Sequence, residues 1–176
     1  MVDAEKPDGV IVCGAIERRA PLTIGLLERG IPVCVETPPA TSAVETLDVA
    51  RVAEETRVLC MSASPRRFSD AYTRARRFVR QHDASEHLTL SIDYACGAYA
   101  GDEYTAIGSQ GSSFLLMLAI DAIDLATFLF GDVREVYAFA REGHGYAASA
   151  LFASGAVGTL NLNDGRTAVL PAEEIE

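Results

Sequence analysis

The stretch VCVETPPA, residues 33–40, decides how the first half of the chain is expected to fold. It opens as an apolar, β-rich run and then reaches an acid, Glu36, which is followed by Thr37 and two prolines. Because proline has no backbone N–H to give to a sheet and has a fixed φ, the strand must end here. We therefore expect a buried strand that ends at Glu36 and a turn that begins at Thr37.

Strand-like and helix-like segments alternate on both sides of this stretch. Continuous apolar runs predict strands at 9–15, 31–36 and 57–62, and helical patterns follow at 20–29, 42–55 and 69–80. Ser42 and Glu45 have the spacing of a capping box, Pro21 suits the first turn of a helix, and Gly30 suits a C-terminal cap. Alternating strands and helices form a parallel sheet, and strands that are apolar throughout are typical of a sheet covered on both faces.

The second half of the chain has a different pattern. A strand is predicted at 87–96, and a long apolar helix is predicted from 114 to 130, where Gly131 ends it. Three more strands, at 133–140, 146–152 and 156–162, are expected to form an antiparallel meander packed on the long helix, with a tight turn at 153–156. The polar segment QHDASE, 81–86, predicts a boundary between a first domain, 1–82, and a second domain, 83–176.

Composition and charge exclude several classes of function. The net charge is −10, which disfavours binding to nucleic acids and to anionic membranes. The longest apolar run contains Asp121 and Asp124, which would be costly at the centre of a bilayer, so it predicts a buried helix and no membrane span. The four cysteines form no C-x-x-C pair and no metal-ligand spacing, and those at 13, 34 and 60 are expected to be buried small hydrophobes in a reducing, cytoplasmic setting.

The run from Pro7 to Val79, together with AIDAIDLATFLFGDVREVYA at 119–138, resembles the Gfo/Idh/MocA oxidoreductases. The segment Glu36-Thr37-Pro38 stands where the family has a strand ending in E-K-P, and Arg66-Arg67-Phe68 stands at an R-R-F-like segment. The resemblance implies an N-terminal Rossmann domain that binds NAD(P) and a reaction on sugars or related polyols. The implied fold class is α/β, with a partial Rossmann-like parallel sheet followed by an α+β domain that holds the long buried helix and the antiparallel strands.

The departures from the family pattern concern its chemistry. Thr37 stands in place of a lysine that aids proton transfer, while the family's acid and histidine on the long helix fall on Met117 and Asp121. A threonine hydroxyl does not titrate near neutrality, and Asp121 could act as a base only if burial raised its pKa. The sequence also contains no G-x-G-x-x-G, the turn that supplies a pyrophosphate site. The resemblance thus implies no cofactor bound by the chain alone, and NAD(P) only if the missing half is supplied.

These considerations give a set of candidate site residues, each with a structural alternative. The candidates are Asp121 and Thr37 for catalysis, Glu36 and Pro38 for cofactor binding, and Asp124, Arg66, Arg67 and Tyr94 for substrate binding. The two aspartates could instead tether a backbone amide or an arginine, and Glu36 could simply fix the turn. The arginines could form a solvated helix face paired with acids, and Tyr94 could pack in the core. No metal site is predicted.

Partners are expected at an exposed sheet edge. In the family, the strand at residues 9–15 pairs with a first strand that this sequence does not contain, which leaves bare N–H and C=O groups. We expect this edge to be covered by another copy of the chain or by a separate protein, and a small-molecule ligand is possible.

Three functions remain open from the sequence. The first is a shortened, catalytically altered relative of the family that acts as a ligand-binding or accessory subunit, or as a redox-neutral enzyme that uses Asp121. The second is an NAD(P)-dependent oxidoreductase of a sugar-like or polyol substrate whose first Rossmann half lies on another chain or is absent from this sequence. The third is a purely structural partner without a ligand. Whether the chain is an enzyme is therefore left open.

Overall fold

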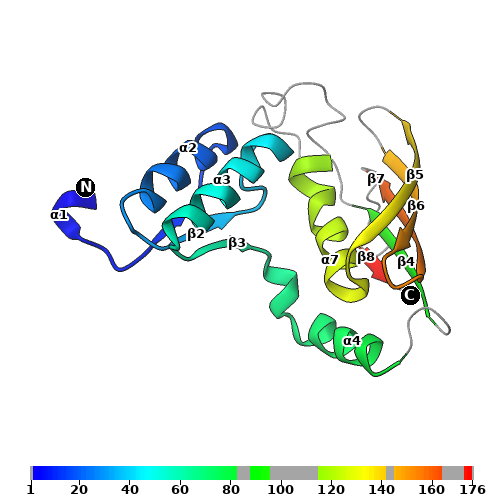
Figure 1. Cartoon of the computed structure of the whole chain (residues 1–176). Helices are drawn as coiled ribbons and strands as arrows, with labels where there is room; N and C mark the ends of the chain where they lie inside the picture. The colour runs from blue at the N-terminus through cyan, green and yellow to red at the C-terminus, as the bar shows by residue number, and fades with distance from the viewer. Residues whose placement is uncertain (1, 83–87, 96–114, 142–144, 164–172, 176) are drawn as a thin grey trace. The chain divides into compact units, whose positions relative to one another are not determined.

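The computed structural model describes residues 2–82, 88–95, 115–141, 145–163 and 173–175, and its contacts divide the chain into two compact units, Met1–Ser64 and Pro65–Glu176 (Figure 1). This division differs from the predicted boundary between residues 82 and 83. The reason is that helix α4 (Asp70–Gln81) packs Tyr72, Ala75 and Val79 against the hydrophobic core of the second unit. A helix that the alternating pattern assigned to the first domain therefore belongs to the second unit.

The first unit is a small parallel α/β layer. Its elements are α1 (Val2–Glu5), β1 (Val10–Val12), α2 (Ile16–Leu27), β2 (Val33–Glu36), α3 (Ala43–Thr56) and β3 (Cys60–Ala63). The strands are parallel in the order β1-β2-β3, and Val12 lies beside Val35, which lies beside Ser62. The predicted parallel sheet and the end of the second strand at Glu36 are confirmed.

The two longer helices of this unit begin and end for identifiable reasons. Helix α2 starts at Ile16, earlier than expected, and it includes Pro21 in its interior instead of in its first turn. Helix α3 is capped by Ser42, whose hydroxyl oxygen accepts a hydrogen bond from the backbone N–H of Glu45 at 3.3 Å. Arg57 ends α3 in the left-handed region at φ 57°.

Among the described residues, an apolar cover is found on one face of the parallel sheet, which differs from the expectation that both faces would be covered. The unit's core includes Val12, Val33 and Val35, together with α2 and α3 residues. On the opposite face, where Ile11, Cys34 and Met61 lie in one row, Ile11 is 74% exposed and Met61 is 44% exposed. Cys13 is also exposed, so the expectation of a buried thiol is wrong there. The physical reason is that the third helix, α4, packs within the second unit.

The second unit is built around a mixed sheet. Its elements are the 3-10 turn η1 (Pro65–Phe68), α4, β4 (Thr89–Ala95), the π-helical turn η3 (Leu115–Ala119), α7 (Ile120–Phe130), β5 (Val133–Arg141), β6 (Gly145–Phe152), β7 (Val157–Asn163) and β8 (Glu173–Ile175). The strand order is β5-β6-β7-β4-β8. The predicted antiparallel meander of β5, β6 and β7 is confirmed. The parallel pairing of β4 with β7 and the antiparallel strand β8 were not predicted.

Helix α7 covers one face of this sheet (Figure 1). Its buried residues include Ala122, Leu125 and Leu129, which share a core with Ile92 and Phe152 of the strands. Gly158 permits close packing here, because a Cβ at that position would lie 3.1 Å from side-chain atoms of both Leu90 and Phe152.

The ends of the helix and of the last hairpin follow the sequence pattern. Gly131 ends α7 at φ 87°, and the tight turn at 153–156 has Gly155 at φ 93°. The predicted first residue of the long helix, Phe114, lies outside the described residues. Within the part of the chain that the structure describes, no helix has the length and apolar character needed to cross a membrane.

Candidate functional site

Glu36 stands at the carboxyl end of β2, where it is held by a buried arginine. Arg19 of α2 is only 5% exposed, and its Nη2 donates to Glu36 Oε2 at 2.6 Å. The same guanidinium donates from Nη1 to the carbonyl oxygen of Pro38 and from Nε to that of Gly14, both at 2.9 Å. Arg19 therefore joins the turn after β1 to the turn after β2 at the carboxyl edge of the sheet.

Arg19 was not among the predicted site residues, although the sequence carries a signal for it. In helix α2 it lies three residues after Ile16 and four residues before Thr23, both of which are buried. An arginine at these spacings falls on the apolar stripe of the helix, where a charged side chain must find partners. The pattern could have marked Arg19 as a buried cation, but it could not name the atoms that Arg19 contacts.

Thr37 and Pro38 lie in the turn that Arg19 holds. The hydroxyl of Thr37 donates to the carbonyl oxygen of Ala63 at 3.1 Å, which ties the end of β2 to the end of β3. Pro38 follows a cis peptide bond and is buried. The structure thus gives Thr37 a hydrogen bond to the backbone and gives Pro38 a place in the interior of the turn.

In the second unit, the structure brings Arg66, Asp121 and Tyr94 together. Arg66 Nη1 lies 2.8 Å from Asp121 Oδ2, and each of the two side chains is 27% exposed. Nη2 of Arg66 donates to the Tyr94 hydroxyl at 3.2 Å, and its guanidinium carbon lies 5.5 Å from the centre of the Tyr94 ring. Three predicted site residues from η1, α7 and β4 therefore form one polar cluster.

Arg67 and Asp124 form a second ion pair one turn along α7. Two guanidinium nitrogens of Arg67 donate to the two carboxylate oxygens of Asp124, with Nε 2.8 Å from Oδ2. The hydrogen bond to Asp124 raises the pKa of Arg67, and the opposite charge adds to this effect. We call Arg66, Arg67, Asp121 and Asp124 the arginine–aspartate clasp, since these residues fasten η1 to α7.

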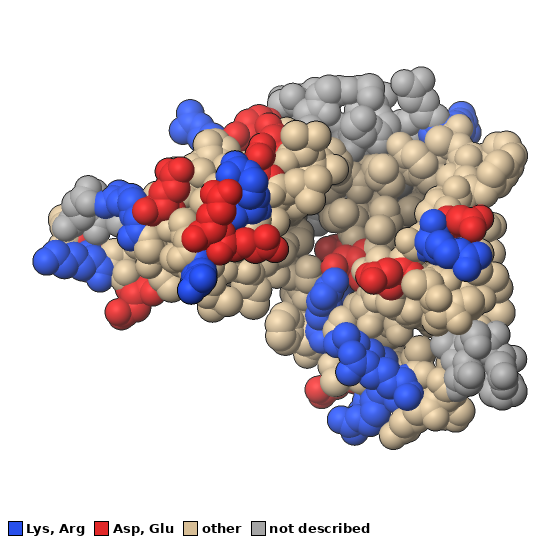
Figure 2. All heavy atoms as spheres, in the orientation of Figure 1, with Lys and Arg blue, Asp and Glu red and all other residues tan. Residues whose placement is uncertain are grey.

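Helix α4 presents further arginines next to the clasp. Arg76 lies 4.1 Å from the centre of the Phe128 ring, and its pKa is lowered by desolvation and by the nearby charges of Arg80 and Arg67. Figure 2 shows the blue side chains gathered over α4. Among the described residues, Arg74, Arg77 and Arg80 have no carboxylate partner, so the expected pairing of this face with acids is not found there.

The predicted site residues therefore fall into two groups. Glu36, Thr37 and Pro38 belong to the first unit, and the clasp with Tyr94 belongs to the second. The side chain of Met117 lies outside what the structure describes. No group of three or more His, Cys, Asp or Glu side chains in the described ranges is arranged to hold a metal ion. The partly exposed carboxylate of Asp121 is suited to accept hydrogen bonds from a polar ligand while its charge is balanced by Arg66.

Comparison with known proteins gives these sites a context. Residues 1–64 match the model of the Gfo/Idh/MocA family, which is described as an oxidoreductase family with an NAD-binding Rossmann fold. The resemblance drawn from the sequence is thus confirmed in the first unit. No curated protein matches the chain.

Solved structures match nearly the whole chain. An oxidoreductase from Agrobacterium radiobacter in complex with NAD+, L-tartaric acid and magnesium is 14% identical with a TM-score of 0.86, covering 99% of this chain and 54% of its own. The WlbA dehydrogenase from Bordetella pertussis, in complex with NADH and UDP-GlcNAcA, is 16% identical with a TM-score of 0.80 and coverages of 95% and 55%. A probable dehydrogenase from Thermotoga maritima is 20% identical with a TM-score of 0.79 and coverages of 93% and 52%.

These likenesses establish the fold. The predicted α/β class, with a parallel sheet followed by a unit that holds a buried helix and antiparallel strands, is confirmed, because all three solved proteins superpose over more than nine-tenths of this chain. The chain spans about half the length of each of them.

Proposed function

We propose that this chain is a ligand-binding or accessory subunit of the Gfo/Idh/MocA type that does not transfer hydride by itself. The observation that carries the proposal is the ion pair between Arg66 and Asp121. Asp121 stands where the resemblance places the general acid/base of the reaction, and its carboxylate forms an ion pair of 2.8 Å with the guanidinium of Arg66. A carboxylate held in this way is better suited to bind a polar group than to shuttle a proton, so we favour binding over redox-neutral catalysis at Asp121.

The interactions of Thr37 support the same proposal. Thr37 stands in place of the family's lysine, and its hydroxyl donates a hydrogen bond to the backbone carbonyl oxygen of Ala63. Threonine cannot supply an ammonium charge to a substrate oxygen, and here its one donor is engaged. Both residues that the sequence analysis assigned to catalysis thus have structural partners in the clasp or at the sheet edge.

The helix N-termini of the first unit also disfavour a dinucleotide pyrophosphate. Helix α2 carries Glu17 in its first turn, and helix α3 is capped by Ser42 and carries Glu45 in its first turn. An acid in the first turn competes with a phosphate for the partial positive charge of the helix end. These acids support the proposal that the chain alone does not hold the diphosphate part of NAD(P).

The second candidate function is NAD(P)-dependent oxidation or reduction of a sugar-like or polyol substrate, with the glycine-rich half supplied by another polypeptide. The match of residues 1–64 to a family with an NAD-binding Rossmann fold favours it, as do the NAD+ and NADH complexes of the solved proteins. In this case the partner would pair with the edge of β1, where Ile11 is exposed. A cytoplasmic location remains part of the proposal in both cases.

Two measurements on the full chain test the proposal. In the first, the chain is mixed with NADH or NADPH, or with their oxidised forms, and a panel of sugars, sugar acids and polyols, and the nicotinamide absorbance is followed. We expect no turnover. Turnover by the chain alone would contradict the proposal, and turnover only after a protein containing G-x-G-x-x-G is added would favour the second candidate.

In the second measurement, the same panel is screened by thermal shift without dinucleotide. We expect at least one polar ligand to raise the Tm of the wild type and not that of Asp121→Asn, each variant being compared with its own unliganded Tm. Asp132→Asn is the matched control, since Asp132 is an exposed acid outside the clasp. If no ligand shifts the Tm, the binding function is wrong and a purely structural role is favoured.

A further inference from the structure

A pocket lies in the second unit where helix α4 meets the start of β4 and the end of α7. Its volume is about 410 Å³, which is within the range of sites that hold small organic ligands. The side chains that line it are apolar apart from Arg74 and Thr89. They include Phe78 and Val79 of α4 and Leu129 of α7. The pocket therefore offers a largely apolar surface to a ligand.

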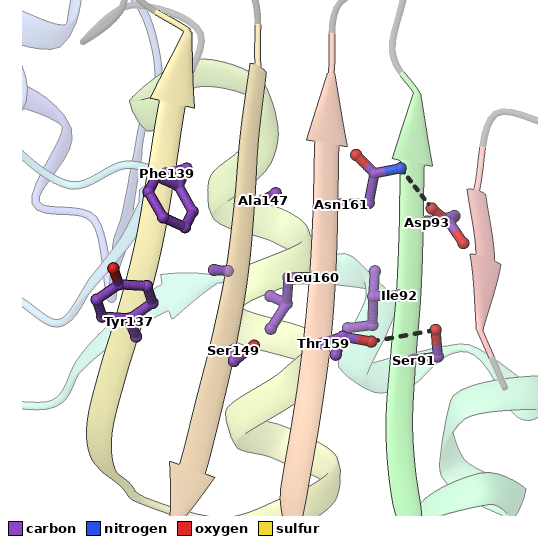
Figure 3. A pocket seen from close by; sticks show the side chains of 11 residues that line it. Ser91, Ile92, Asp93, Tyr137, Phe139, Ala147, Ser149, Thr159, Leu160 and Asn161 are labelled. Atoms are coloured by element: carbon purple, nitrogen blue, oxygen red, sulfur yellow. Dashed lines mark hydrogen bonds between the residues drawn. The ribbon is translucent and has the colours of Figure 1, made fainter.

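Strand β4 contributes to the apolar lining because its side chains alternate between the two faces of the sheet. Figure 3 shows the face opposite α7, where a groove of about 300 Å³ is lined by Ser91 and Asp93. Ser91 accepts a hydrogen bond from the Thr159 hydroxyl at 3.4 Å on that face. Leu90 belongs to the core that α7 covers, and it is 3% exposed. The pocket therefore takes its lining from the hydrophobic core, and the polar groups of Figure 3 do not line it.

One wall of the pocket is an aromatic side chain that is open to water. Phe78 is 52% exposed, whereas Leu129 and Phe130 in the same lining are 5% and 9% exposed. The ring of Phe78 lies against that of His82, with the ring centroids 4.2 Å apart. Nδ1 of His82 in turn lies 2.8 Å from the carbonyl oxygen of Phe78. A ligand with an apolar body would remove part of the Phe78 ring from water, which favours binding.

Arg74 is the one charged residue among the described residues that line the pocket. It is exposed, and Arg77 and Arg80 follow it at spacings of three residues, which places them on the same side of α4. The sequence of α4 contains a single acid, Asp70. A guanidinium stays ionised in proteins and can bind a carboxylate through two parallel hydrogen bonds. This local excess of positive charge, in a chain with a net charge of −10, favours an anion at the pocket.

The apolar lining and the arginine select one class of ligand. A sugar or polyol would bury hydroxyl groups against side chains that offer few hydrogen-bond partners, which is costly. An apolar molecule without a charge would make no use of Arg74. We propose that the pocket binds a carboxylate with an apolar body, such as a medium-chain fatty acid, with the body against Phe78 and Leu129 and the carboxylate on Arg74. The pocket shares no lining residue with the arginine–aspartate clasp, so the inference does not depend on the proposed function.

The experiment titrates the full chain with decanoate by calorimetry. We expect saturable binding of one decanoate per chain. Decanol, which has the same apolar body without the charge, should bind at least about 10-fold more weakly, and decylammonium should bind more weakly still. Higher ionic strength should weaken the binding of decanoate and leave that of decanol unchanged, because salt screens only the charged ligand. The absence of saturable decanoate binding overturns the proposal, and so does equal affinity for decanoate and decanol.

One pair of variants tests the contact with the carboxylate. Arg74→Gln should weaken the binding of decanoate about 10-fold and leave that of decanol unchanged. Arg77→Gln is the matched control, because Arg77 is an exposed arginine of the same helix that does not line the pocket. It should weaken the binding of decanoate less than about 3-fold, through the loss of a more distant charge. Equal effects of the two variants would contradict a direct contact with Arg74.

A second pair of variants tests the contact with the apolar body. Phe78→Ser should weaken the binding of both decanoate and decanol, since each places its chain against the ring. Phe68→Ser is the matched control, because Phe68 is 72% exposed and lies outside the pocket, and it should change neither affinity. Arg74 and Phe78 are exposed, so the fold should survive both changes, as judged by circular dichroism. Decanoate binding that neither Arg74→Gln nor Phe78→Ser weakens would overturn the proposal and place the ligand elsewhere.

Discussion

Arg66 and Asp121 are separated by 55 positions in the sequence, yet their side chains form an ion pair of 2.8 Å in the second unit. Arg67 and Asp124 repeat the arrangement at the next turn of α7. Two consecutive arginines thus meet two aspartates three residues apart, and such aspartates share one side of the helix. Asp121 stands at the position of the family's general acid/base. In this chain, Asp121 and Asp124 hold η1 to α7 through their ion pairs with Arg66 and Arg67.

The first prediction concerns the stability that the clasp supplies. Asp121→Asn removes the negative charge opposite Arg66 in a partly buried setting and should lower the free energy of unfolding of the second unit by roughly 1–2 kcal/mol. Urea unfolding followed by circular dichroism measures the loss. Glu135→Gln, which removes an acid from an exposed pair with Arg134, should change the same quantity by less than about 0.5 kcal/mol. Equal effects of the two changes would show that the clasp adds nothing beyond a surface ion pair.

The second prediction concerns the buried arginine of the first unit. Arg19→Ala leaves the carbonyl oxygens of Gly14 and Pro38 and the Glu36 carboxylate without their donor, which should destabilise the unit by about 3 kcal/mol. Amide hydrogen exchange of residues 33–40 should become faster. The neighbouring Arg18 is exposed, and Arg18→Ala is the matched control that should leave exchange unchanged. Unaltered exchange in Arg19→Ala would mean that the turn does not depend on Arg19.

The third prediction is a pH effect at the start of α3. The pKa of Glu45 is lowered from 4.5, chiefly because its carboxylate accepts hydrogen bonds from the hydroxyl and the backbone N–H of Thr41. A lowered pKa means that the fold favours the ionised form, so this stabilisation is present above pH 4.5 and is lost as the pH falls through the folded-state value. Thr41→Val should bring the pKa of Glu45 back towards 4.5, as measured by NMR titration of the carboxyl carbon. If Thr41→Val leaves the pKa of Glu45 unchanged, the hydroxyl of Thr41 is not the cause of the lowered pKa.

The fourth prediction concerns thiol reactivity. Burial raises the pKa of Cys60, and the nearby Cys34 adds to this, whereas Cys13 is exposed. A raised pKa leaves less thiolate at a given pH, so iodoacetamide at pH 8 should label Cys13 several-fold faster than Cys60. Peptide mass spectrometry at successive times measures the two rates. In urea, which unfolds the chain, the labelling rates of Cys13 and Cys60 should become similar. A difference that persists in urea would come from the residues next to each cysteine in the sequence and not from burial.

Local features of the sequence predicted much of the fold. The prolines after Thr37 ended β2, Ser42 capped α3 and Gly131 ended α7, because each of these effects depends on residues within one turn of the chain. The pairing of β4 with β7 could not be predicted, since the two strands are more than sixty residues apart and their pairing depends on how the whole unit packs. The placement of α4 failed for the same reason: its amphipathic pattern shows that one face is buried but not against which core.

The sequence identified the residues of the candidate site but not the interactions between them. Sequence reasoning selected Arg66, Arg67, Asp121 and Asp124 and left open whether the acids bind a ligand or tether an arginine. The structure supplies the pairing, because hydrogen-bond partners across the fold are set by packing that no local spacing encodes. Arg19 was missed, although its position on the buried stripe of α2 is visible in the sequence.

The central claim, that this 176-residue chain does not hold a dinucleotide by itself, is tested most directly by calorimetric titration of the chain with NADH and NADPH. The account predicts no saturable heat for either nucleotide. Saturable binding with one nucleotide per chain would contradict it.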